Sequence, residues 1–289
     1  MERMQDIPFE VFTACRSRDL VTLCYVVEHL RTHLKPKNIV IATAHKNFVS
    51  FEKVLGAPVS LVDEDKLIPS MTLASIRQLP IQFFPRAAGW YFQQLLKYAW
   101  CYQNAGIGHY LVWDADTIPL KPLNFFDEQG RTLMTKASEY HAPYFATFER
   151  LFGVPATYEF SFISQHQMVD KMLLQEMLNS IATRFPASLN WAWAILQSLP
   201  REGKNLFSEY ETYGHWLKLY HPDKLRYRDV PWLRQGTEVA GFPPSEKKLK
   251  DLSERYFFVS FESSKRPLKR MISRLWATAY SLKNQFAQK

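Results

Sequence analysis

The sequence predicts an α/β protein with a mixed, mostly parallel sheet flanked by helices. Short runs of β-branched and aliphatic residues alternate with helical patterns through the first third of the chain, which is typical of parallel strands joined by helices. Of the 289 residues, 47% are hydrophobic and 15% are aromatic, so the chain can bury a large core. The strongest strand pattern ends in two aspartates, at the kind of strand end where open α/β sheets bind ligands.

The first elements alternate between strand and helix. We expect strands at Phe9–Ala14, Asn38–Thr43 and Val59–Val62, separated by helices at Leu20–His33 and Asn47–Leu55. Asp19 is placed to cap the first helix, and Gly56 is placed to end the second.

The middle of the chain holds one long loop and the clearest helix. Three prolines in Leu67–Arg86 predict a loop. Ala88–Asn104 has apolar residues at helical spacing and stops before two glycines. The strand Tyr110–Trp113 follows, and Pro119 closes it.

The second half is expected to be mostly helical. His141–Pro155 is rich in aromatic residues and is predicted to be irregular. We expect short strands at Thr132–Lys136, Phe160–Ile163 and Tyr256–Phe261, and helices that begin after the capping residues Ser164, Ser188, Ser208 and Ser245.

The C-terminal end differs in charge from the rest. The chain has a net charge of +8, and from Ser245 onward it holds 11 Lys and Arg against 4 Asp and Glu. Pro267–Gln288 predicts a helix with one apolar stripe and basic residues beside it. We therefore expect a domain over residues 1–262 and a basic amphipathic helix over 263–289. This helix could lie on a membrane surface, or pack on the body of the protein or on a second subunit.

Three cysteines with no metal-ligand spacing are typical of reduced thiols in a cytoplasmic protein. The N-terminus lacks the apolar core of a signal peptide, and no run is long enough to span a membrane. We expect a cytoplasmic protein, with the C-terminal helix as its possible contact with the inner face of the cytoplasmic membrane. The neutral charge of the first 244 residues argues against a nucleic-acid partner.

Asp114 and Asp116 follow the buried strand Tyr110–Trp113. On an extended backbone, residues two apart point to the same side, and two carboxylates on one side repel unless a cation lies between them. Mg²⁺ is commonly held by one or two carboxylates together with substrate phosphates. The alternative is a chance pattern, because the chain has a second D-x-D at Asp63-Glu64-Asp65.

Three features together resemble the GT-A class of glycosyltransferases, and among them the bacterial enzymes that build surface polysaccharides such as lipopolysaccharide or capsule. They are the loop Arg16-Ser17-Arg18-Asp19 after the first strand, the helix Gly89–Lys97, and the segment Trp113–Thr117 with its D-x-D. The likeness covers residues 9–262. It implies a GT-A (Rossmann-like) fold in which residues 1–127 bind a nucleotide sugar and residues 128–262 form a helical half that binds the acceptor.

The resemblance implies metal-dependent transfer of a hexose-type sugar from a nucleotide sugar, such as a UDP-sugar, to a glycan or lipid-linked acceptor. Asp116 is similar to the family residue that binds the Mn²⁺ or Mg²⁺ on the donor diphosphate, with Asp114 beside it touching ribose or donor sugar. Arg16 and Asp63 match positions that hold the nucleotide. Gln94 and Lys97 would face the donor from the helix before the D-x-D; the alternative for them is a solvated helix face.

An inverting transferase needs a carboxylate to take the proton from the acceptor hydroxyl. Glu209 is our first candidate, and Glu211 is the second because a capping box with Ser208 would also explain it. His215 could be a further metal or phosphate ligand, or an ordinary core residue. The aromatic stretches Tyr140–Phe148 and Trp191-Ala192-Trp193 could stack sugars or pack in the core.

Two other functions stay open. A nucleotidyltransferase that makes nucleotide sugars shares such a sheet, but it would have a glycine-rich loop where this chain has Cys15–Asp19. A non-catalytic protein that binds membrane surfaces would use only the basic C-terminal helix. If so, the D-x-D would be incidental.

Overall fold

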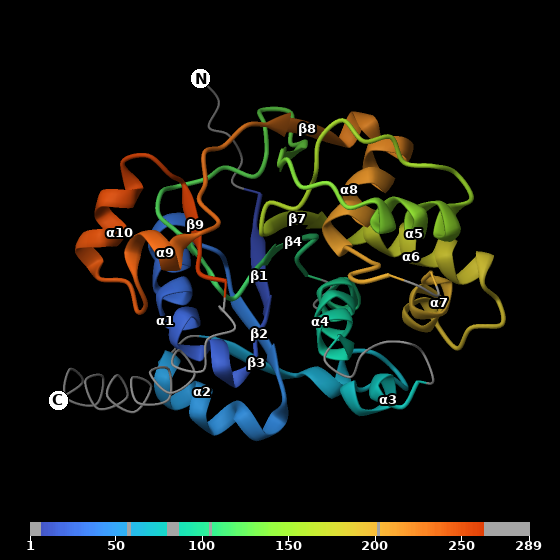
Figure 1. Cartoon of the computed structure of the whole chain (residues 1–289), viewed down its shortest axis with the longest axis horizontal. Coiled ribbons are helices and arrows are strands. Elements are labelled where there is room, and N and C mark those ends of the chain that lie inside the picture. Colours follow the sequence, from blue (N-terminus) through green and yellow to red (C-terminus); the bar gives the residue numbers. More distant parts are fainter. Residues whose placement is uncertain (1–6, 57–58, 80–86, 104–105, 201–202, 263–289) are drawn as a thin grey trace. The chain divides into compact units, whose positions relative to one another are not determined.

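The computed structural model describes residues 7–56, 59–79, 87–103, 106–200 and 203–262, which form two compact units (Figure 1). Unit 1 holds the described residues of 7–9, 65–112 and 125–229, and unit 2 holds those of 10–64, 113–124 and 230–262. The chain crosses between the units several times. Each unit therefore combines segments from both predicted halves, 1–127 and 128–262.

The core of unit 2 is a parallel sheet. Its strands are β1 (Phe9–Ala14, whose first residue is assigned to unit 1), β2 (Ile39–Thr43) and β3 (Ser60–Asp63), in the order β3-β2-β1. Val40 of β2 is in register with Phe12 on one side and with Ser60 on the other. Every residue of β2 is buried, as expected for an Ile-Val-Ile run with neighbours on both edges and both faces covered. The three predicted strands are confirmed.

The helices of unit 2 are α1 (Leu20–His29), α2 (Phe48–Leu55), α9 (Gly236–Ala240) and α10 (Glu246–Ser253). Gly56 ends α2 with a φ of +63°, and Ser245 caps α10 by accepting from Lys248 N, both as predicted. The predicted cap at Asp19 is wrong, because its side chain makes no capping hydrogen bond and instead pairs with Arg18 at 3.2 Å.

Two short strands complete unit 2. β5 (Thr117–Pro119) pairs antiparallel with β9 (Phe258–Ser260), with Ile118 opposite Val259. Pro119 was expected to close the strand that begins at Tyr110. That strand, β4 (His109–Trp113), ends earlier, and Pro119 is instead the last residue of the separate strand β5. α1 packs against β5 and α2.

Unit 1 has two pairs of strands. β4 (His109–Trp113, whose last residue is assigned to unit 2) is the neighbour of β7 (His166–Asp170), and β6 (Thr132–Thr135) pairs in parallel with β8 (Leu225–Arg228). Three of the strand pairs described above are parallel (β1–β2, β2–β3 and β6–β8), whereas β5–β9 is antiparallel. With helices packed beside them, this confirms the predicted mixed, mostly parallel α/β class.

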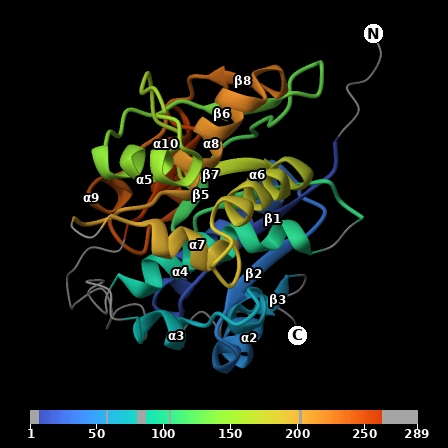
Figure 2. The same ribbon diagram turned by 90° about the vertical axis from the view of Figure 1, so that its right-hand side faces the viewer.

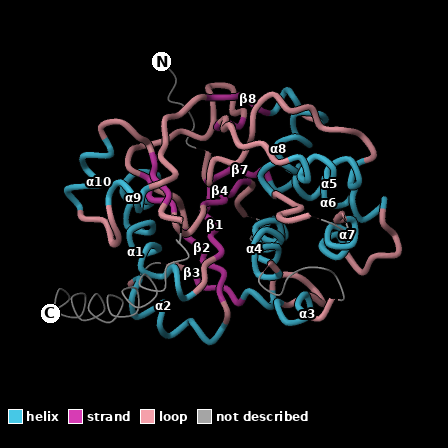
Figure 3. Tube along the Cα trace, viewed as in Figure 1, coloured by secondary structure: helices cyan, strands magenta, loops and turns pink. Residues whose placement is uncertain are grey.

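The helices of unit 1 are α3 (Leu73–Arg77), α4 (Ala88–Ala99), α5 (Ala142–Phe152), α6 (Lys171–Arg184), α7 (Trp191–Ser198) and α8 (Glu209–Tyr220). α5, α6, α7 and α8 pack together, and α4 packs against α8 and α3 (Figure 2). The stretch after β7 is mainly helical, as predicted for the second half (Figure 3).

Two local predictions for this helical part are wrong. Residues after Ser164 form β7 rather than a helix, because Gln165 has a φ of +65° that a helix cannot contain and Ser164 donates to His166 O. His141–Pro155 is not irregular, because it contains α5 with Pro143 in its first turn and Gly153 at its end with a φ of +76°.

α6 and α7 begin at other residues than predicted, because other side chains cap them. α6 begins at Asp170, whose carboxylate accepts from Met172 N and Leu173 N. α7 is capped by Asn190 rather than by Ser188, whose hydroxyl bonds to Gln197. Phe160–Ile163 forms only a single bridge, between Ser161 and Ala137, and Leu67–Arg86 includes the short helix α3.

The C-terminal helix predicted at 263–289 lies outside the described residues. No helix within the described ranges is long and apolar enough to cross a membrane. All three cysteines are free thiols and are buried, which agrees with the expectation of reduced cysteines.

Candidate functional site

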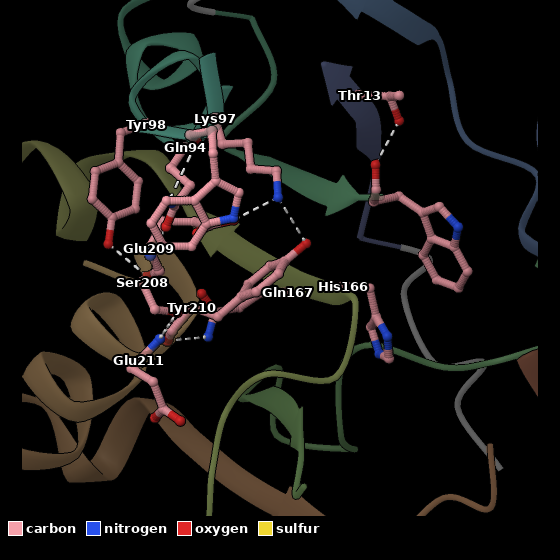
Figure 4. Close-up of polar contacts among 12 residues, drawn as sticks. Thr13, Gln94, Lys97, Tyr98, His166, Gln167, Ser208, Glu209, Tyr210 and Glu211 are labelled. Atoms are coloured by element: carbon pink, nitrogen blue, oxygen red, sulfur yellow. Dashed lines mark hydrogen bonds and ion pairs between the residues drawn. The ribbon is translucent and has the colours of Figure 1, made fainter. Parts of the chain in front are cut away.

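The D-x-D segment forms a turn in unit 2. Thr117 N donates to Asp114 O at 3.0 Å, and Asp116 O accepts from Phe261 N at 2.7 Å. Trp113 anchors the start of this turn: its carbonyl accepts from Thr13 Oγ1 at 2.7 Å (Figure 4), and its Nε1 donates to Thr117 O at 2.6 Å. The expectation of an extended backbone is therefore wrong here. Both carboxylates are half-buried on a tight turn that is held by Thr13 of β1 and by Phe261, the residue directly after β9.

Asp116 lies near the loop that follows β1. Burial raises the pKa of the Cys15 thiol well above its usual value, and the negative charges of Asp19 and Asp116 raise it further. Burial also raises the pKa of Asp19, and the nearby guanidinium groups of Arg18 and Arg16 oppose that rise. Charges of both signs therefore gather where β1 ends.

Arg16 and Asp63 lie at the same edge of the sheet in unit 2. Ala14 is in register with Ala42, and Asp63, the last residue of β3, is in register with Thr43. Arg16 follows β1 by two residues, and both Arg16 and Asp63 are half-buried. Parallel strands bring their carboxyl ends to one edge, so the four predicted donor residues of this unit lie at or directly after strand ends.

The donor set suits a hard cation. Asp114 and Asp116 offer carboxylate oxygens, which Mg²⁺ and Mn²⁺ prefer, and both reach solvent, where substrate phosphates could complete the coordination. Within the described parts of the chain, no three His, Cys, Asp or Glu side chains are grouped to hold a metal ion by themselves. The two aspartates fit a metal that arrives with a phosphate-bearing ligand better than a permanent structural metal.

The predicted residues of unit 1 meet where α4 contacts α8. Lys97 Nζ lies 2.5 Å from Glu209 Oε1, Gln94 Oε1 accepts from Glu209 N at 3.1 Å, and Tyr98 OH donates to Glu209 O at 2.6 Å (Figure 4). Only 4% of Lys97, 4% of Glu209 and 2% of Gln94 is exposed. The alternative of a solvated helix face is therefore wrong for Gln94 and Lys97. We call this group, Gln94, Lys97, Tyr98 and Glu209, the α4–α8 clamp.

Glu211 has different partners from those of a capping box. Ser208 Oγ accepts from Glu211 N at 3.3 Å, which caps α8 as predicted. The Glu211 carboxylate, however, accepts from Ser161 Oγ and from Phe162 N. It ties the segment before β7 to the first turn of α8.

His215 is enclosed rather than exposed. Its Nε2 lies 3.1 Å from Glu211 Oε2, a close contact that lacks hydrogen-bond geometry. The rings of Phe145, Phe148 and Phe162 surround it, with centroid distances of 5.2, 6.1 and 5.0 Å. This environment is that of a core histidine. The metal-ligand role for His215 stays a prediction.

Sequence reasoning missed Glu139. Burial raises the pKa of the Tyr144 hydroxyl, and the charges of Glu139, Glu209 and Glu211 are among the groups that raise it further. Glu139 therefore lies near the carboxylates at the start of α8, but unlike them it is half-buried rather than buried. No sequence pattern marks it, because it lies in the irregular segment before α5.

Comparisons with known proteins give a family and several structures. A model described as a family of unknown function (DUF6492) matches residues 16–230. Among curated proteins, no relative matches the sequence. The similar solved structures include the galactosyltransferase LgtC in complex with donor and acceptor sugar analogs (9% identity, TM-score 0.46, 95% of this chain and 96% of that chain). Another is mouse xyloside xylosyltransferase 1 in its apo form, with 12% identity and a TM-score of 0.45 over 88% of this chain and 97% of that chain. The apo structure of the bifunctional glycosyltransferase WbbM is also similar, with 8% identity and a TM-score of 0.47 over 97% of this chain and 52% of that chain.

Proposed function

The chain belongs to this family of unknown function, and we propose that it is a glycosyltransferase that moves a sugar from a UDP-sugar to a glycan or lipid-linked acceptor. The observation that carries the proposal is the Asp114–Asp116 turn, which lies near the loop after β1. Two half-exposed carboxylates at strand ends suit a site for a metal and a diphosphate.

Asp116 and Asp114 are the residues that would hold Mn²⁺ or Mg²⁺. Such a cation stabilises the negative charge that builds up on a diphosphate leaving group. In the proposal, Arg16 offers its guanidinium to the nucleotide phosphates, for which its fork of donors is suited, and Asp63 accepts hydrogen bonds from the nucleoside.

Gln94 and Lys97 were expected to face the donor. Their contacts in the α4–α8 clamp support a positioning role, because both side chains hold Glu209 at the start of α8. We propose that Gln94 and Lys97 keep the start of α8 in place for the acceptor. If they contact the donor, they do so while they remain bound to Glu209.

We propose an inverting reaction in which a carboxylate near the start of α8 removes the acceptor proton. Glu209 is our first candidate and Glu211 the second, although both are buried and hold structural contacts. Glu139 joins them as a third candidate, because it lies near the same helix end and reaches solvent. A base must come within hydrogen-bond distance of the hydroxyl, and acceptor binding could complete that geometry.

The first experiment tests donor binding and cleavage. We would titrate UDP-, GDP- and CMP-sugars with and without Mn²⁺, using the intact protein and Asp116→Ala. Metal-dependent binding and slow hydrolysis of one nucleotide sugar, both lost in the variant, would support the proposal and identify the nucleotide. If no nucleotide binds in either condition, the argument from Asp114 and Asp116 fails.

A second experiment identifies the base. The pH dependence of kcat would be compared for Glu139→Gln, Glu209→Gln and Glu211→Gln, with the free energy of unfolding measured for each. Loss of the base removes the rise of kcat with increasing pH, whereas a purely structural residue lowers stability and leaves the shape of the profile intact. A profile unchanged in all three variants would contradict an inverting mechanism that uses these carboxylates.

We also propose, from its sequence alone, that the basic segment 263–289 brings the enzyme to a membrane surface. Sedimentation with anionic phospholipid vesicles would compare the full chain with a chain ending at residue 262. Equal binding by both would contradict the proposal without affecting the transfer reaction.

A further inference from the structure

Three aromatic side chains of unit 1 form a cluster that opens to solvent. Tyr140 stacks on Phe145 with ring centroids 5.3 Å apart at 28°, and Tyr158 packs edge-on against both, at 4.8 Å and 5.8 Å. Tyr158 OH also donates to Ser138 O at 3.2 Å, which ties the segment before β7 to the segment before α5. The hydrogen bond and the mutual packing restrain the rings, so they form a platform rather than a set of mobile side chains.

Tyr140 and Tyr158 of the platform are more exposed than the aromatic residues that pack in the core. Tyr140 is 59% exposed and Tyr158 is 37% exposed, whereas Tyr144, Phe148 and Trp191 are each at most 8% exposed. Phe145 stacks on Tyr140 and Tyr158 packs against it, yet more than half of Tyr140 stays exposed and is available for contact with a ligand. The structure thus separates the aromatic residues that pack in the core from those that are available to a ligand.

The platform adjoins the candidate carboxylates. Phe145 packs edge-on against His215, with centroids 5.2 Å apart, and His215 contacts Glu211 at 3.1 Å. Glu139 directly precedes Tyr140 in the chain and is among the charges that act on Tyr144, together with Glu209 and Glu211. The platform is therefore joined to the first turns of α8 through Phe145.

We propose that Tyr140, Phe145 and Tyr158 stack a pyranose ring of the acceptor glycan, and that Glu139 accepts hydrogen bonds from its hydroxyl groups; this rests on the proposed function. A pyranose has a C–H-rich face that packs on an aromatic ring and a rim of hydroxyl donors. Tyrosine rings beside a half-exposed carboxylate offer both kinds of contact.

The test measures sugar binding without any donor. Saturation-transfer NMR on the full chain would use the methyl pyranosides of glucose, galactose, mannose and N-acetylglucosamine as probes. We expect at least one to receive saturation on its ring C–H protons, with binding weakened about tenfold in Tyr140→Ala and in Tyr158→Ala. Tyr140→Phe should bind like the unaltered protein, because the stacking face is kept. Tyr102→Ala is the matched control, since Tyr102 is a 47% exposed tyrosine of the same unit outside the platform.

Two results would overturn the proposal. One is the absence of saturation transfer to all four pyranosides, or transfer that neither alanine variant changes. The other is a dimer in sedimentation velocity that Tyr140→Ala dissociates, which would make the platform a contact between two copies of the chain. Donor hydrolysis is measured separately on the unaltered protein, and we expect the control Tyr102→Ala to leave it unchanged. Pyranoside binding without donor cleavage would refute the proposed function alone, and donor cleavage without pyranoside binding would refute the platform alone.

Discussion

The carboxylates at the start of α8 and those of the Asp114–Asp116 turn have opposite surroundings. Glu209 is buried and bound by Lys97, with Gln94 and Tyr98 holding its backbone, and Glu211 is buried between Ser161, Phe162 and His215. Asp114 and Asp116 are half-buried on a turn that is held by backbone hydrogen bonds. The comparison teaches that charged residues at a candidate site differ in how much the fold itself depends on them, and that burial of the charge indicates how much. The predictions below test this division.

The largest effect is expected from the α4–α8 clamp. Lys97→Met leaves the Glu209 carboxylate buried without its cation, and this should lower the free energy of unfolding by about 3–5 kcal/mol. Urea denaturation measures it. Lys97→Met combined with Glu209→Gln should recover much of the loss, because no buried charge is left. Lys224→Met is the control: its pair with Asp223, at 3.9 Å with side chains 58% and 73% exposed, should contribute less than about 1 kcal/mol. If Lys97→Met lowers the free energy of unfolding by less than about 1 kcal/mol, the buried Lys97–Glu209 pair is no more important for stability than the exposed Lys224–Asp223 pair.

At the Asp114–Asp116 turn we expect a substitution to reduce activity strongly and to change stability little. Asp116→Asn should change the free energy of unfolding by less than about 0.5 kcal/mol. It should lower kcat/KM for donor cleavage by about 100- to 1,000-fold, because charge stabilisation in the transition state is lost. Steady-state kinetics and urea denaturation on the same samples separate the two effects. Asp65→Asn, in the second D-x-D, is the matched control and should leave activity intact. If it inactivates the protein equally, the choice between the two motifs is wrong.

Packing around α8 offers a smaller effect. A Cβ at Gly214 would lie 2.3 Å from Phe162 Cγ, a ring that is 1% exposed and packs on His215. Gly214→Ala should therefore destabilise the protein by about 1–3 kcal/mol, as overpacking does. Gly108→Ala, whose Cβ would meet nothing within 4 Å, should be close to neutral in the same thermal or urea unfolding measurement. If the two variants are equally stable, the Phe162 ring can move enough to make room for a methyl group at position 214, and the overpacking argument is wrong.

Lowering the pH should reduce the stability of the folded protein gradually, through the buried His166 of unit 1. Burial, with the nearby Arg228 cation, lowers the pKa of His166 to about 3. In the unfolded chain a histidine takes up its proton near pH 6.5, so between about pH 6.5 and 3 the unfolded state binds more protons than the folded state. Stability therefore falls as the pH is lowered through this window, by at most about 1.4 kcal/mol per pH unit from this group.

His166→Gln should flatten that slope when the free energy of unfolding is measured from pH 7 to pH 4.5. His45→Gln, at an exposed position, should keep the slope of the unaltered protein. The same slope in all three proteins would mean that other groups dominate the acid sensitivity.

Much of the fold could be predicted because short runs of neighbouring residues determine where these strands and helices begin and end. The Ile-Val-Ile run of β2, the glycine after α2 and the serine before α8 each act within a few residues of where they stand. Predictions failed where the same residue types permit more than one local arrangement. Ser164 had the composition of a helix start, but its hydroxyl bonds to His166 O and the next residue adopts a positive φ.

The candidate site also has parts that the sequence predicts and parts that only the folded structure shows. The sequence by itself determined the parallel strands and the pair of aspartates that follows one of them, because strand period and strand ends depend on neighbouring residues. Only the tertiary structure decided that Lys97 meets Glu209, 112 residues away, and that Tyr140 meets Phe145 and Tyr158 at the surface. Both depend on how elements pack, since an ion pair is buried or a ring exposed only after the chain has folded. The physical reason is that burial is a property of the whole core, and no local pattern contains it.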